Sequence, residues 1–133
     1  MENTYSLQDL EQMMTGYAKG REIFTNLAIC LVDLAQKGTE LVLTTRRTNE
    51  SRNIKYKFLC AEDGEGEVYL LAYTSEDMIP GKEDLHMVPV SIRDIFEFTN
   101  SRSDIEGIVF NHSTDNIIFS KRAVRLFSLI LSK

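Results

Sequence analysis

The spacing of apolar residues changes sharply at Gly38, and this change limits what the chain can fold into. Before Gly38, apolar residues recur every three or four positions, which predicts one helix from Leu7 to Tyr17 and another from Ile23 to Leu34. After Gly38 they form short runs or alternate with polar residues, as in β-strands. The order predicts an α/β or α+β fold, a single domain with helices packed on a mixed sheet of about five or six strands.

Serine residues mark the expected helix starts. A serine just before a helix accepts a hydrogen bond from a backbone N–H of the first turn. Asp9 follows Ser6 by three residues, which resembles a capping box. The predicted N-caps are Ser6, Ser75, Ser91 and Ser120, and Gly38 is the expected end of the second helix.

The later apolar runs predict strands of different kinds. Val68–Tyr73 is apolar on both faces, which is typical of a central strand covered by helices on each side. His86–Val90 contains Pro89 and is therefore expected at a sheet edge. Residues 54–60 alternate as a half-buried strand, residues 46–53 form a loop, and residues 111–116 form the turn of a hairpin.

Two helices carry more apolar residues than one buried stripe requires. Ile29, Cys30 and Val32 widen the stripe of the second helix, so we expect it to be enclosed on most sides. In the last helix Leu126 and Ile130 adjoin the stripe that covers the sheet. We expect these residues to be buried within the domain; the alternative is that they pair with a second copy or another protein.

Composition narrows the classes of partner and the location. Fifteen Lys and Arg residues against twenty Asp and Glu residues give a formal charge of −5, which argues against broad attraction to nucleic acid or anionic membranes. Cys30 and Cys60 lie in apolar runs, so buried, reduced thiols are expected. Ile23–Ala35 is too short to span a bilayer and residues 1–4 lack the features of a secretory signal, so a cytoplasmic location is expected.

Two segments of the second half resemble the SseB protein N-terminal domain family, named for a serine-sensitivity phenotype. Tyr69–Asp77 resembles the family's strand followed by F-T-S-x-E, and Gly107–Ser120 resembles its G-[IV]-V-[IVF]-N-P-x-x-D-x-[LIF] hairpin. The helix between Ser91 and Asn100 and the paired N-terminal helices are also similar, so the resemblance covers residues 6–130. His112 replaces the family's usual Pro, and Tyr73 its usual Phe. The resemblance implies one SseB-like domain over residues 1–133, bacterial, with an interaction or regulatory role and no defined reaction.

The hexapeptide 111–116 holds two amides, an imidazole, two hydroxyls and a carboxylate. His112, Ser113 and Asp115 are too close in sequence for one turn to aim all three at one atom, so no catalytic residues are expected. We expect Asn111 and Asp115 to accept backbone N–H bonds that hold the hairpin; the alternative is a binding surface. The candidate ligand- or partner-binding residues are Asn111, His112, Thr114, Asp115, Asn116, Thr74 and Ser75.

The remaining polar clusters predict neither a metal nor a cofactor. Residues 62–67 lack the spacing of a calcium loop and of a phosphate loop. The two His and two Cys residues are not at the spacing of zinc ligands. The basic residues Arg46, Arg47, Arg52, Lys55 and Lys57 are expected to be a solvated face, the alternative being recognition of an acidic protein or nucleic acid.

These observations favour a non-catalytic protein-interaction or regulatory module. Its expected partner is an unidentified protein or a second copy of the chain, with no nucleic acid and no membrane. The alternative is a small-molecule sensor linked to amino-acid metabolism, as the family name implies. For that alternative we expect a pocket near the 111–116 turn and the helix start at Thr74 and Ser75.

Overall fold

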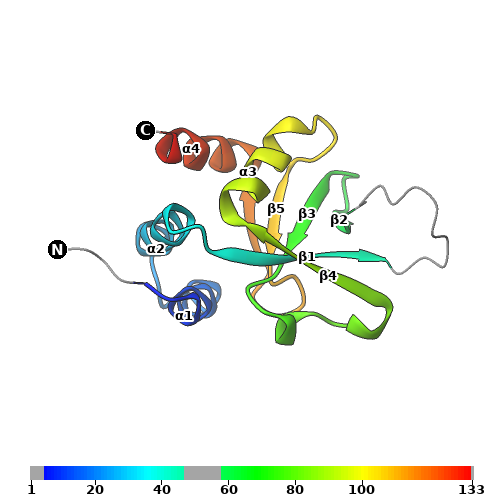
Figure 1. The fold of residues 1–133 in the computed structure, drawn as a ribbon, viewed down its shortest axis with the longest axis horizontal. Helices are drawn as coiled ribbons and strands as arrows, with labels where there is room; N and C mark the ends of the chain where they lie inside the picture. Colours follow the sequence, from blue (N-terminus) through cyan, green and yellow to red (C-terminus); the bar gives the residue numbers. More distant parts are fainter. Residues whose placement is uncertain (1–4, 47–57, 133) are drawn as a thin grey trace.

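The computed structural model describes residues 5–46 and 58–132 of the 133-residue chain. Within these ranges it contains four α-helices and six β-strands in two sheets (Figure 1). The predicted class, an α/β or α+β domain with helices packed on mixed strands, is confirmed. The predicted loop and most of the predicted strand at residues 54–60 lie outside the described residues.

The helices begin where local capping signals place them. They are α1 (Leu7–Ala18), α2 (Phe24–Gln36), α3 (Ile92–Ser101) and α4 (Lys121–Leu131). Ser6 Oγ accepts from the Asp9 N–H at 3.2 Å, and the Asp9 carboxylate accepts from the Ser6 N–H at 2.8 Å, which completes the predicted capping box. Ser91 and Ser120 cap α3 and α4 in the same way. None of the described helices has the length and apolar character needed to cross a bilayer.

The cap predicted at Ser75 is wrong. Its side chain makes no capping hydrogen bond, and only a single 3₁₀ turn, η1 (Glu76–Met78), follows it. A second 3₁₀ turn, η2 (Lys82–Asp84), begins after Gly81, whose φ of 63° suits glycine. A three-residue turn is too short to be stable as an isolated helix. The conformation of residues 76–84 therefore depends on contacts with the rest of the fold.

The strands divide into two sheets. In the first, β1 (Glu40–Arg46) pairs with β4 (Leu85–Ser91) antiparallel. In the second the order is β2-β3-β5-β6, formed by β2 (Cys60–Glu62), β3 (Val68–Ala72), β5 (Gly107–Phe110) and β6 (Ile117–Ser120), with β3 and β5 parallel. The sheets are linked by two hydrogen bonds between Val42 and Tyr73, of 2.8 and 2.9 Å, and by Leu59, whose N–H donates to the Thr44 carbonyl at 2.8 Å and whose carbonyl accepts from Leu71. As predicted, Val68–Tyr73 is central, and among the described strands the one with Pro89 is paired on one side only.

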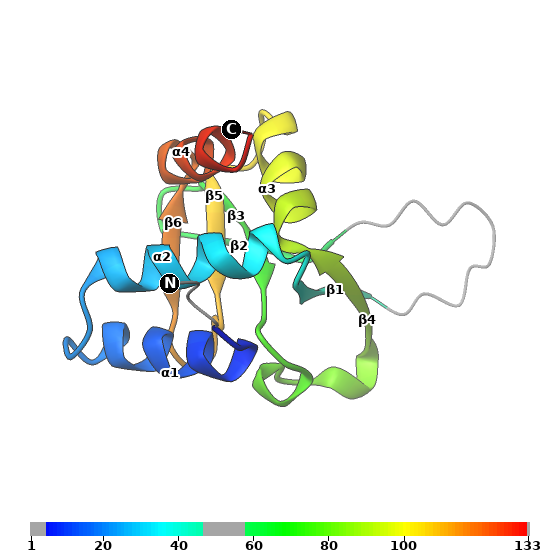
Figure 2. The same ribbon diagram turned by 60° about the vertical axis from the view of Figure 1, so that its left-hand side comes forward.

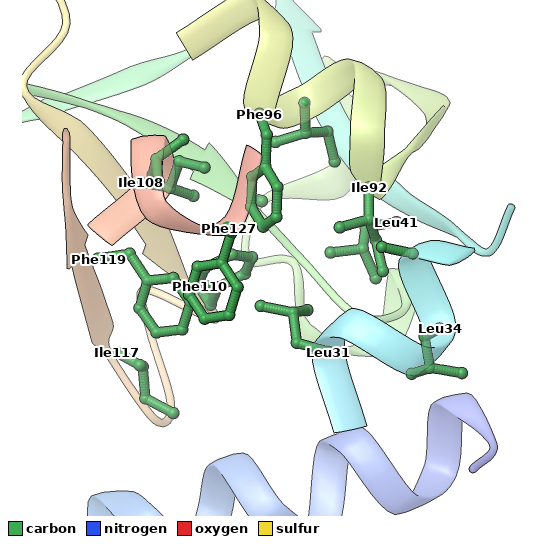
Figure 3. Close-up of a cluster of buried hydrophobic side chains, with 14 of the residues drawn as sticks. Leu31, Leu34, Leu41, Ile92, Phe96, Ile108, Phe110, Ile117, Phe119 and Phe127 are labelled. Carbon is green, nitrogen blue, oxygen red and sulfur yellow. The ribbon is translucent and has the colours of Figure 1, made fainter. Parts of the chain in front are cut away.

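All four helices pack on one face of the four-stranded sheet. Figure 2 shows α1 and α2 side by side in front of β5 and β6, with α3 and α4 toward one end of the strands. The buried apolar residues of the four helices form one cluster with that face of the sheet, which carries Leu70, Ala72, Ile108, Phe110, Ile117 and Phe119 (Figure 3). The prediction that helices cover both faces of β3 is therefore wrong, because every buried helical stripe points to this one cluster.

The β5–β6 hairpin is built on a close backbone approach. A Cβ at Gly107 would lie 2.1 Å from the Phe119 carbonyl oxygen, so no other residue fits there without moving the strand. The turn that follows contains two asparagines, Asn111 and Asn116, each with φ of 51°. Asparagine adopts this left-handed conformation more readily than most residues, which explains why asparagine occupies both positions.

Candidate functional site

Asn111 holds the hairpin turn to the neighbouring strand. Its side chain is fully buried, and Oδ1 accepts a hydrogen bond from the backbone N–H of Thr74 at 3.0 Å. Its Nδ2 donates to the Thr74 hydroxyl at 3.2 Å and to Asp115 Oδ2 at 3.2 Å. The predicted backbone bond is therefore made, but to the end of β3 rather than within the turn.

Asp115 ties the same turn to the first helix. Its Oδ1 accepts from the hydroxyl of Thr15 on α1 at 3.0 Å, while its Oδ2 accepts from Asn111. The predicted backbone N–H partners of this carboxylate are replaced by side chains. Asn111, Thr74 and Asp115 do converge, but their polar atoms bind one another and Thr15, so this polar cluster holds the fold together.

The other predicted site residues do not join this cluster. His112, Thr114 and Asn116 are exposed, and Ser75 is half-buried. The Ser113 hydroxyl donates to the Met78 carbonyl at 3.3 Å and the Thr114 hydroxyl to the Asn111 carbonyl at 3.3 Å. Across the described ranges, no histidine–carboxylate or histidine–hydroxyl pair of the kind a hydrolase needs is formed.

The outer surface of α2 is apolar and exposed, which corrects the expectation that this helix is enclosed. Leu27, Cys30 and Leu31 are fully buried, but Phe24 and Ile29 on other sides of the helix are 42% and 44% exposed. Ile23, just before the helix, is 63% exposed. The reason is that the helices form a single layer, so none of the described elements covers the side of α2 that points away from the sheet.

The last helix departs from expectation in the same way. Val124, Phe127 and Leu131 form its buried stripe, as predicted. The adjoining Leu126 and Ile130 are 56% and 49% exposed, so the expectation of full burial is wrong. Leu129 is also 62% exposed. The alternative, a surface available to another molecule, is the one that the geometry favours.

A cavity of about 510 Å³ lies between these two helices and is here called the α2–α4 groove. Phe127 contributes to its lining and is held rigidly, stacked on Phe119 with ring centroids 5.4 Å apart (Figure 3). Phe24 lies against Phe119 edge to face at 5.6 Å. The groove is lined by Phe24, Thr25, Ala28, Ile29, Val32, Asp33, Gln36, Phe127 and Ile130. This groove is formed by other elements than the 111–116 turn, near which a pocket was expected.

The one carboxylate of the groove already has partners. Asp33 Oδ2 lies 2.6 Å from Lys37 Nζ and 3.4 Å from the backbone nitrogen of Tyr5. The free side chains of the groove are therefore mainly apolar. Such a lining gains free energy by losing contact with water, about 25 cal/mol for each Å² of apolar surface covered.

The two cysteines differ. Cys30 is fully buried, and burial raises the pKa of its thiol to about 11. Cys60 is exposed, which corrects the expectation of a buried thiol, although desolvation also raises its pKa. A buried thiol with a raised pKa is a poor nucleophile, and Cys30 is part of the apolar core.

The acidic turn at residues 62–67 is held by its own hydrogen bonds. Asp63 Oδ1 accepts from the N–H groups of Glu65 and Glu67, each at 2.9 Å, so the acidic turn is a hydrogen-bonded hairpin turn. Among the described residues, no three His, Cys, Asp or Glu side chains are grouped closely enough to hold a metal ion. The predicted basic face at Arg47, Arg52, Lys55 and Lys57 lies outside the described residues.

The apolar surplus on both helices is visible in the sequence, where burial in the core was the expectation. The signal that could have found the groove was the second apolar stripe of the last helix, at Ala123, Leu126 and Ile130. Only the packing of α2 beside α4 shows that this stripe borders a cavity. Neither a family model, a curated protein nor a solved structure matches the chain.

Proposed function

We propose that this chain is a non-catalytic protein-interaction module whose partner binds in the α2–α4 groove. The observation that carries the proposal is the exposed apolar surface on both sides of that cavity. Ile29 on α2 and Ile130 on α4 each line the groove with nearly half of the side-chain surface in solvent. Contiguous apolar surface of this kind marks sites of association in soluble domains.

The polar cluster of the 111–116 turn supports the non-catalytic part of the proposal. A nucleophile, a base or an oxyanion donor must have an unused polar atom that faces a substrate. Asn111 and Asp115 instead hydrogen-bond to Thr74, Thr15 and each other. These hydrogen bonds link the hairpin to α1 and to the end of β3 within the protein itself.

A small-molecule sensor is the second candidate, and the volume of the cavity is the observation that favours it. The 510 Å³ lies within the range of about 300–1,000 Å³ that ligand pockets span. A specific small ligand also needs a few convergent polar groups, however, and Asp33 is already paired with Lys37. Exposed Leu126 and Leu129 extend the apolar surface beyond the residues that line the cavity, which favours a larger partner.

The proposed family and location of the chain rest on its sequence. We propose an SseB-like regulatory module of a bacterial cytoplasm, on the basis of the Tyr69–Asp77 and Gly107–Ser120 segments. The formal charge of −5 supports a protein partner rather than nucleic acid or an anionic membrane. An amino-acid-linked ligand remains the alternative that the family name implies.

Site-specific photo-crosslinking tests the proposal. A photoreactive phenylalanine analogue is placed at Leu129, beside the groove, or at Ile118 on β6, which is 55% exposed and serves as the matched control. In native lysate we expect one discrete crosslinked species from position 129, and its loss when Ile130→Asp is added. Equal crosslinking from position 118 would contradict the proposal. A metabolite that raises the melting temperature, but not that of Ile130→Asp, would favour the sensor.

A further inference from the structure

One side of α4 joins the groove to positive charge. Arg122, Leu126 and Ile130 are spaced by four residues and form one stripe along the helix, about 12 Å long. Ile130, at one end, lines the groove, and all three side chains are exposed. Arg125 and Leu129 form a second exposed stripe beside it. A molecule that lies on this apolar surface therefore reaches a guanidinium within two helical turns.

These two arginines are not used by the fold. Within the described ranges, neither Arg122 nor Arg125 makes a hydrogen bond or an ion pair. Other cations near α4 are engaged: Arg93 donates to the Leu131 carbonyl at 2.9 Å, Lys121 donates to the Arg102 carbonyl, and Arg102 pairs with Asp104 at 2.8 Å. The contrast singles out Arg122 and Arg125 as positive charges available to another molecule.

The position of these charges conflicts with the stability of their own helix. The N-terminal end of a helix is the positive end of its dipole, where acidic residues are favourable. The capped helices α1 and α3 carry Asp9 and Asp94 in their first turns. The first turn of α4 carries no acidic residue and begins instead with Lys121 and Arg122. Such a departure from local preference is expected where a residue serves binding rather than folding.

The opposite wall of the groove suits a helix. Phe24, Ala28 and Val32 are also spaced by four residues, and all three line the groove. The small Ala28 between two larger side chains leaves room for one inserted apolar side chain. Ridges of one helix pack into grooves of this kind between residues four apart on another.

We infer that the occupant of the α2–α4 groove is an amphipathic helix of another protein that carries acidic residues beside its apolar face. The inference rests on the proposed function and names the chemistry of its partner. The apolar side chains enter between Val32 and Ile130, and carboxylates placed about two turns away meet Arg122, with Arg125 one stripe farther from the groove.

Charge argues against the other occupants. A second copy packed along α4 would bring its own Arg122 and Arg125, and the described part of α4 offers no acid to meet them. An anionic bilayer would satisfy the arginines, but a flat surface would leave the cavity between the helices unfilled.

Two synthetic peptides test the inference with the full chain. Both are 18-residue helices with the same leucines at positions i, i+4 and i+7; one carries Glu and the other Lys beside them. Fluorescence anisotropy is expected to show that the Glu peptide binds about fivefold or more tightly, with the difference shrinking at high salt. Arg122→Glu with Arg125→Glu should reverse the preference, Ile130→Asp should abolish binding of both peptides, and Ile118→Asp should change neither. Circular dichroism establishes that each variant is folded.

Three outcomes would overturn the inference. Equal affinity of the two peptides, or no binding of the Glu peptide at millimolar concentration, would exclude an acidic helix. A dimer in sedimentation equilibrium that is lost in Ile130→Asp would assign the groove to a second copy. Binding to phosphatidylglycerol vesicles that is lost in the same variant would assign it to a membrane. Discrete crosslinking from position 129 together with any of these results would leave the interaction module standing, unless the crosslinked species is the dimer itself.

Discussion

The hairpin turn 111–116 and the α2–α4 groove reverse the roles that their compositions suggest. The turn gathers the polar groups of a binding site, yet its central residue Asn111 is fully buried and hydrogen-bonded within the protein. The groove is lined by residues of the kind that form a core, yet Ile130 and Ile29 are nearly half exposed. The buried polar atoms of the turn bond within the protein, whereas part of the apolar lining of the groove faces solvent.

The difference has a physical basis in what each group must satisfy. A buried polar atom must find a hydrogen-bond partner, so a cluster of polar residues close in sequence supplies partners for itself. An apolar side chain has no specific partner to find and is stabilised by any contact that excludes water, including a contact with another molecule. Unused apolar surface is therefore the more informative trace of function in this chain.

The largest difference should appear between the alkylation rates of the two thiols. These rates report whether the Cys30 side of α2 is buried against the rest of the protein. At pH 8 we expect iodoacetamide to label Cys60 about 10³-fold faster than Cys30, because the Cys30 thiol is buried with a pKa of about 11. Mass spectrometry over time measures both rates, and in urea the two should become similar. Comparable rates in the native protein would show that α2 is not held against the sheet.

Substitutions on the buried and the exposed side of α4 should have very different effects on the free energy of unfolding. Phe127→Ala removes a ring packed against Phe96 and Phe119 and should lower the free energy of unfolding by about 3–5 kcal/mol. Leu129→Ala, on the exposed side, should change it by less than about 0.5 kcal/mol. Urea denaturation measures both. A large loss for Leu129→Ala would mean that the outer side of α4 is covered within the domain.

The contribution of the polar cluster to stability can be measured by comparing substitutions at two matched asparagines. Asn111 and Asn116 have the same φ of 51°, so replacing either by glycine imposes no backbone strain. Asn111→Gly leaves the buried Thr74 N–H without its acceptor and should cost about 2–3 kcal/mol, whereas Asn116→Gly should be close to neutral. Thermal denaturation compares the two. Equal effects would remove the reason to call the turn structural.

A smaller loss is expected at the edge of the same cluster. Asp115→Ala removes the acceptor of the Thr15 hydroxyl and should destabilise by about 1 kcal/mol. His112→Ala, at an exposed position, should leave stability unchanged. If His112→Ala or a stably folded Asp115→Ala abolished partner binding instead, the turn would regain the role of a binding surface.

The smallest effect should have the opposite sign. Arg122→Glu places an acid at the positive end of the α4 dipole and should stabilise the protein by about 0.5 kcal/mol. The same change should weaken binding of an acidic helix, so stability and affinity move apart. Differential scanning fluorimetry in low salt measures the gain; a loss of stability would show that Arg122 has a structural role after all.

Sequence alone determined the features that depend on neighbours along the chain. Ser6, Ser91 and Ser120 were recognisable as caps because the N–H that each accepts lies three residues away. The central strand and the edge strand with Pro89 followed from alternation and from the missing N–H of proline. The cap at Ser75 was wrong because the short η1 turn depends on tertiary contacts rather than on its own sequence.

Tertiary structure alone decided which apolar stripes are buried. The sequence shows that α2 and α4 each have more apolar surface than one contact requires, but not whether a second layer covers it. Because all four helices lie on one face of the sheet, Leu27 and Phe127 reach the core while Ile29 and Leu129 do not. The hydrophobic effect has no direction of its own, so only the placement of the layers assigns one stripe to the core and the other to solvent.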